Sequence, residues 1–152
     1  MGRLLKEVSF FLCKCLTRAI IDIRKNRGEF MVTIEEAQDM LDEIAESLPT
    51  EFYKELNGGI LLIPEAKRSS HAIKDDLYTM GEYHHSGSMG RIIYIYYGSF
   101  ERIYGNTSPE KMKQRLKDTL LHEFTHHLES LAGEKGLEKK DAESLRKYQA
   151  RY

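Results

Sequence analysis

The chain has 152 residues, a length that fits one domain with one modest core. Its 23 Lys and Arg residues nearly balance 24 Asp and Glu residues, for a formal net charge of -1. This balance argues against nucleic-acid binding, which requires a basic surface facing the phosphates. The hydrophobic fraction of 41% is typical of a soluble globular protein.

The first 30 residues differ from the rest. Residues 4–24 predict an amphipathic helix that has no obvious partner, so we divide the chain into an appendage, 1–30, and a domain, 31–152. An overcalled start codon is the other interpretation of this appendage. Lys14 and Arg18 interrupt its apolar run, so it predicts neither a secretion signal nor a membrane span.

The chain contains two cysteines, Cys13 and Cys15. Residues so close rarely form a good disulfide, and two thiolates alone make no structural zinc site. We therefore expect buried or free thiols in a reducing compartment and a cytoplasmic protein.

The predicted elements of the domain begin with a helix. Thr33 and Glu36 form a capping box ahead of apolar residues at helical spacing, which predicts a helix over 34–47 that ends at Pro49. A short helix over 51–56 follows.

Three strands are expected next, over 60–63, 77–83 and 91–97. The last is β-branched and aromatic throughout, and Gly81 within the second indicates a bulge. The segments between them predict a loop over 65–76 and a turn over 86–88.

A long helix dominates the C-terminal half. Ser108 and Pro109 give a strong helix start and Gly133 a stop, so we expect a helical turn over 99–105 and a helix over 109–132. A charged helix over 137–150 completes the chain. The predicted fold class is α+β: a small, mostly antiparallel, twisted sheet packed on the long helix, with a helix at each end.

The long helix carries the motif H-E-x-x-H at His122, Glu123 and His126. Its two histidines lie one helical turn apart, roughly 6 Å along the axis, so both imidazoles can bind one Zn²⁺. Glu123 stands beside the ion, where a general base can take a proton from activated water. Mn²⁺, Co²⁺ and Fe²⁺ are alternative metals for such a ligand set.

A catalytic zinc site usually has a third protein ligand. The metzincin spacing fails, because Glu129 stands in the glycine position and Ala132 in that of the last histidine. We favour Asp141, then Glu138, which both follow the turn after the long helix. Glu129 lies about 10 Å along the helix from His122, which suits a partner of His126 better than a ligand.

Other polar residues have less specific patterns. We expect His127 to form a hydrogen bond in the core or to act as an oxyanion donor. The tyrosine-rich strand with Tyr94, Tyr96 and Tyr97 indicates packing more than catalysis. His84 and His85 lack an evident third ligand for a second metal site.

The order of elements, with Leu-His-Glu-Phe-Thr-His-His at 121–127 in a long helix, resembles the small bacterial zincin-like metallopeptidases. The resemblance covers about residues 31–145 and implies a twisted sheet ahead of the helix, zinc as the metal, His122 and His126 as ligands and Glu123 as the base. It matches Asp141 to the family's acidic ligand, although the spacing here is longer.

These patterns predict a zinc metallopeptidase that acts on a peptide or protein. We expect the substrate to pair with the edge of the strand over 91–97. The alternatives are a metal-bound regulatory or interaction protein without turnover, and a hydrolase of other substrates. The sequence leaves the oligomeric state open.

Overall fold

The computed structural model describes residues 31–134 and 136–151. The predicted appendage, with Cys13 and Cys15, lies outside these residues. The elements, in chain order, are α2 (Ile34–Glu46), the 3₁₀ turn η1 (Thr50–Tyr53), β1 (Gly59–Ile63), β2 (Lys67–Arg68), β3 (Tyr78–Thr79), β4 (Gly81–Ser86), β5 (Gly90–Tyr96), α3 (Tyr97–Tyr104), α4 (Pro109–Ala132) and α5 (Gly136–Gln149).

The helix boundaries follow the capping residues. The Glu36 N–H donates to Thr33 Oγ1, and the Thr33 N–H donates to the Glu36 carboxylate, so the capping box of α2 is confirmed. The Lys111 N–H donates to Ser108 Oγ at the start of α4. Gly133 ends α4 with a φ of 73°, a left-handed conformation that favours glycine.

The main sheet has three strands in the order β1-β5-β4. β5 pairs in parallel with β1 and antiparallel with β4, so the fold is α+β but this sheet is mixed, not mostly antiparallel. The prediction that the strand over 91–97 offers an edge to a substrate is wrong, because β5 is central. Its apolar residues suit a strand flanked on both sides, whereas β4 carries polar side chains and forms an edge.

Two other predicted elements differ in detail. The strand predicted over 77–83 is interrupted at Met80 and forms two strands, β3 and β4. β4 pairs with β5, whereas β3 pairs with β2, a strand that lies within the predicted loop over 65–76. The predicted helix over 51–56 is the single turn η1, and Glu55 after it has a positive φ of 60°.

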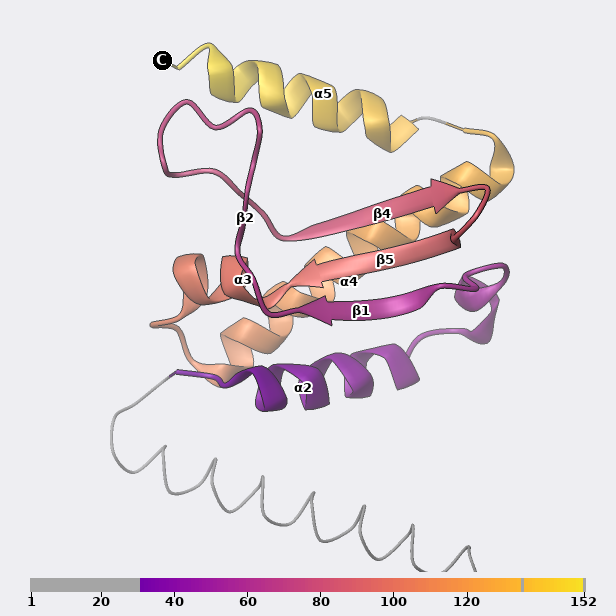
Figure 1. Cartoon of the computed structure of the whole chain (residues 1–152), viewed down its shortest axis with the longest axis horizontal. Helices are drawn as coiled ribbons and strands as arrows, with labels where there is room; N and C mark the ends of the chain where they lie inside the picture. Colours follow the sequence, from indigo (N-terminus) through magenta and orange to yellow (C-terminus); the bar gives the residue numbers. More distant parts are fainter. Residues whose placement is uncertain (1–30, 135, 152) are drawn as a thin grey trace, which may run out of the picture.

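The core is formed mainly by residues of α2, α3 and α4 together with one face of the main sheet, whose arrangement Figure 1 shows. Ile93 and Ile95 of β5 are fully buried, as are Leu116, Leu120 and Phe124 of α4. α4 thus packs its apolar face on β4 and β5, and α5 contacts α4. Among the described residues, no helix has the length and apolar character that crossing a membrane requires.

The other face of the sheet carries a polar cluster around Glu82. Tyr96 Oη donates to Glu82 Oε2 at 2.7 Å, and Lys67 Nζ and His84 Nε2 contact the same oxygen. Burial alone raises the pKa of Glu82, but the hydrogen bonds from Lys67, Tyr96 and His84 outweigh it and hold that pKa below its usual range.

Replacing Glu82 with glutamine should therefore destabilise the protein in a pH-dependent way. A lowered pKa in the folded state means that the carboxylate stabilises the fold above the unfolded-state pKa, about 4.3, and loses this effect as the pH falls through the folded value. Urea unfolding should show wild type about 1 kcal/mol more stable than Glu82→Gln near neutral pH, with the difference shrinking below about pH 4. The exposed Glu46 offers the control Glu46→Gln, and an equal difference at both pH values would contradict this account.

Candidate metal centre

α4 positions the three residues of the H-E-x-x-H motif. His122 and His126 lie one turn apart, with their ring centroids 4.9 Å from each other. Glu123 points from a neighbouring face of the helix towards the sheet, and only 5% of it is exposed. The apolar stripe of α4 fixes this orientation, because Leu120 and Phe124 pack into the core on either side of Glu123 along the chain.

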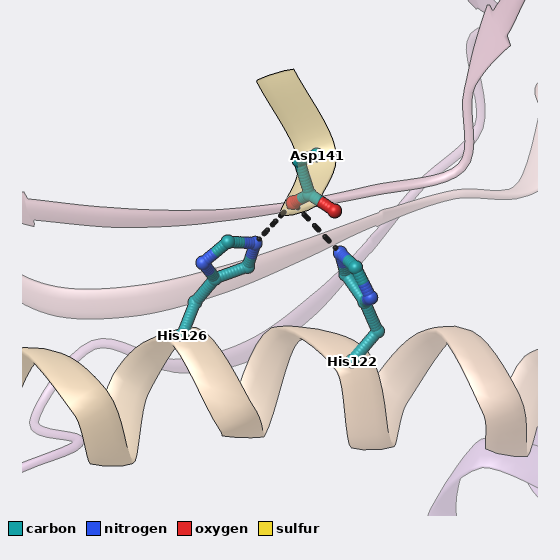
Figure 2. Close-up of side chains that lie close together, drawn as sticks. All are labelled: His122, His126 and Asp141. Atoms are coloured by element: carbon teal, nitrogen blue, oxygen red, sulfur yellow. Dashed lines mark hydrogen bonds and ion pairs between the residues drawn. The ribbon is translucent and has the colours of Figure 1, made fainter. Parts of the chain in front are cut away.

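The third residue of the cluster is Asp141, on α5. Its Oδ2 lies 2.9 Å from His126 Nε2 and 3.3 Å from His122 Nε2 (Figure 2). In the described part of the chain, these three residues form a group of potential metal ligands whose ligand atoms all lie within 4.8 Å of one another. Glu138 does not belong to it.

The spacing of these atoms suits a tetrahedral ion. With bonds of about 2.0–2.1 Å, two ligands of a tetrahedral Zn²⁺ stand roughly 3.4 Å apart. The 3.3 Å distance from Asp141 to His122 is close to this value, whereas the 2.9 Å distance to His126 is that of a hydrogen bond, which an ion bound between the two side chains would lengthen. Two imidazoles and one carboxylate also leave a fourth position for another ligand, so the donor set fits zinc.

Glu129 has a different role from the one predicted. Its Oε2 accepts a hydrogen bond of 2.8 Å from the N–H of Leu137, in the first turn of α5. The carboxylate therefore binds the start of the next helix, where unpaired N–H groups and the helix dipole favour a negative charge.

Burial is the main influence on Glu123. It raises the pKa of this carboxyl to about 8, the negative charges of Asp141 and Glu82 add to the shift, and a hydrogen bond from the Tyr83 N–H opposes it. A cation held by His122 and His126 would also oppose it, since a nearby positive charge favours the carboxylate.

Gly81 of β4 lies directly against Glu123. A Cβ at this position would stand 2.9 Å from both Cγ and Oε1 of Glu123 and 2.8 Å from Thr119 Cγ2. Glycine is therefore required by the close approach of α4, and the bulge expected at this position is instead the beginning of β4.

His127 serves the core. It is fully buried, its Nε2 lies 2.9 Å from the carbonyl oxygen of Lys54, and its Nδ1 lies 3.5 Å from Tyr83 Oη. Burial lowers its pKa. Because a carbonyl oxygen can only accept, Nε2 is the donor of the hydrogen bond to Lys54. His127 thus links α4 to the segment before β1 through Lys54, and it is not part of the group formed by His122, His126 and Asp141.

The remaining predicted polar residues lie away from the centre. Tyr97 Oη donates to the Val32 carbonyl, and Tyr96 binds Glu82. The Tyr94 ring packs edge-on against His84. Because side chains alternate along a strand, His84 and the adjacent His85 of β4 point to opposite faces and do not converge on one ion.

A cleft of about 380 Å³ opens beside the centre. Its lining includes His122 and Glu123 and continues along α4 towards its N-terminus, with β4 and the residues just before it as the other wall. The lining residues are Thr79, Met80, Gly81, Tyr104, Arg115, Asp118, Thr119, His122 and Glu123. The general base predicted from sequence thus borders a space that a small group can enter.

Comparison with known proteins identifies a structural relative. A solved structure from "Thermo thermophilus", described as a conserved hypothetical protein, is 33% identical to the chain and superposes with a TM-score of 0.58. The match covers 66% of this chain and 98% of that one. The chain belongs to the same family as this conserved hypothetical protein. No family model and no curated protein matches the chain, and the description of the relative carries no activity.

Proposed function

We propose that the protein is a zinc-dependent metallopeptidase with a minimal zincin-like fold. The observation that carries the proposal is the convergence of His122, His126 and Asp141 around one point, with Glu123 beside them at a cleft. This is the arrangement that hydrolysis by a metal-activated water requires. The resemblance of the motif to small bacterial zincin-like metallopeptidases supports the same reaction.

Each residue has a role in this proposal. His122, His126 and Asp141 would hold the ion, which supplies a Lewis acid for the scissile carbonyl and lowers the pKa of a water molecule. Glu123 would accept the proton of that water and pass it to the leaving amine. The Tyr83 N–H, which donates to the Glu123 carboxylate, would keep this base oriented between α4 and β4.

The edge of β4 gives the substrate a place to bind. In the β4–β5 ladder Glu82 lies opposite Tyr94 and His84 opposite Ile92, while the Tyr83 N–H donates to Glu123 and so faces away from β5. In an antiparallel edge strand, the backbone N–H and C=O groups of alternate residues face away from the neighbouring strand. Those of Gly81 and His85 can therefore pair with an extended peptide. That peptide would pass Glu123 and the cleft.

The second candidate is a metal-bound regulatory or interaction protein without turnover. It is favoured by the burial of Glu123, which is 5% exposed and already accepts a hydrogen bond from Tyr83. A hydrolase of other substrates would use the same residues, because water activated by a metal attacks many electrophiles.

The test is a screen of zinc-loaded protein against mixed peptide libraries, read by mass spectrometry. We expect new amino termini in the loaded protein and none after treatment with a chelator, with activity restored by added zinc. Cleavage that is unchanged by the chelator, or no cleavage of any peptide by loaded protein, would contradict a metallopeptidase.

Replacing Gly81 with alanine should impair hydrolysis without removing zinc. The new methyl group would displace the Glu123 carboxyl, since it stands 2.9 Å from two atoms of this side chain. We expect kcat to fall at least about tenfold, because small displacements of a catalytic group are costly. Gly87→Ala is the matched control, as its Cβ would meet nothing within 4 Å. Equal activity of the two variants would contradict the assigned contact.

A further inference from the structure

α5 has an unusual attachment for a helix of 14 residues, because none of its residues is buried. Most helices in proteins owe their stability to an apolar face packed on the core, and short helices alone are marginal in water. α5 must therefore be held mainly by specific polar contacts. The structure shows such contacts at its start, its middle and its end.

The contact at the start comes from α4. Glu129 in the last turns of α4 accepts a hydrogen bond from the Leu137 N–H through Oε2. Its other oxygen lies so near Gly136 that a Cβ there would approach it to 3.0 Å. The carboxylate thus fixes where α5 begins and the direction in which it leaves the turn after Gly133.

The contact at the end comes from the loop between β2 and β3. Tyr148 Oη donates to Asp76 Oδ1 at 2.6 Å and accepts a hydrogen bond of 3.3 Å from the Ile73 N–H. Between these two anchors, Asp141 reaches the two histidines of α4 (Figure 2).

The side chains of His122 and Asp141 are 41% and 44% exposed. Ion pairs between such exposed groups contribute little to stability, because water screens them. A metal ion that binds Asp141 and both histidines would join α5 to α4 far more strongly, since bonds to a metal couple directly to folding.

We propose that α5 is a metal-dependent clamp, and that Glu129 and Tyr148 are positioning residues that hold it so that Asp141 completes the metal centre. The inference rests on the metal centre proposed above, and not on peptide hydrolysis. Metal binding and the docking of α5 are coupled, and such coupling is reciprocal. The ion should therefore order α5, and the contacts of Glu129 and Tyr148 that dock α5 should raise the affinity for the ion.

The first test is hydrogen–deuterium exchange of the full chain, read by mass spectrometry in zinc-loaded and chelated protein. We expect amides of residues 137–149 to exchange at least about tenfold more slowly with zinc bound, while the buried part of β5 changes little. Equal exchange of α5 with and without bound zinc would overturn the clamp and leave the zinc site standing.

The second test is zinc affinity, measured by competition with a fluorescent chelator. We expect Glu129→Ala and Tyr148→Phe each to weaken binding by about tenfold, as the loss of residues that orient metal ligands does. Glu129→Gln should recover most of the affinity, because its amide oxygen can still accept from the Leu137 N–H. Glu143→Ala is the control within α5, since this exposed carboxylate pairs with Lys147.

The outcomes separate the clamp from the proposed function. Unchanged zinc affinity in both anchor variants would overturn the clamp alone. Because α5 buries no residue, thermal unfolding of the core should be equal in the chelated variants and in chelated wild type. A loss of stability in both chelated variants would instead assign Glu129 and Tyr148 a purely structural role. If wild type takes up no zinc, the clamp and the metallopeptidase fail together.

Discussion

Replacing Glu123 with glutamine should lower peptide hydrolysis by about 10²–10⁴-fold, the usual contribution of a general base. Glutamine has nearly the same shape, but its amide cannot take a proton from water. Because Glu123 lies beside the three candidate ligands and not among them, zinc content should stay near that of wild type. Activity measured with zinc-loaded protein and elemental analysis of the same sample test both parts.

The control for this variant is Glu138→Gln. Glu138 is an exposed carboxylate on α5 that does not belong to the cluster, so the same change of charge there should leave hydrolysis unaffected. Full activity in Glu123→Gln would remove the assigned base. Loss of activity together with loss of zinc would indicate that Glu123 binds the ion or supports the site.

Replacing Phe124 with alanine should lower the free energy of unfolding by about 3–5 kcal/mol. Phe124 is fully buried, and its ring centroid lies 5.5 Å from that of Phe52 and 5.2 Å from that of Tyr53. Removing the ring leaves a cavity between α4 and η1. Urea unfolding of the chelated protein measures the effect without a contribution from bound metal.

Leu61→Ala is the matched control, because Leu61 of β1 is 46% exposed and its loss should cost less than about 1 kcal/mol. Phe124→Leu should fall between the two, since leucine refills part of the cavity. Equal stabilities of Phe124→Ala and Leu61→Ala would contradict the packing of α4 against η1.

The residues that sequence patterns locate well are those governed by local rules. Capping at Thr33 and Ser108 and the stop at Gly133 depend on a few neighbouring residues, and these boundaries agree with the structure to within one residue. The convergence of His122 and His126 follows from helix geometry alone. The place of Asp141 after the turn favours it as a third ligand, and the structure brings it within 3.3 Å of both histidines.

The features that the sequence does not predict depend on distant partners. The central place of β5 follows from parallel pairing with β1, which lies far earlier in the chain, and no local pattern encodes that register. The contacts of Glu123 with Gly81 and Tyr83 join α4 to β4 in the same way. Helical spacing places Glu129 near His126, whereas its partner belongs to the next helix.

The central claim is that His122, His126 and Asp141 form a zinc site. Elemental mass spectrometry of purified wild type, His126→Ala and Asp141→Ala tests it most directly. The account predicts close to one zinc per wild-type chain and a clear loss in both variants, because each removes one of three ligands. Wild type that holds no metal after zinc is supplied, or zinc that remains in both variants, would contradict the account.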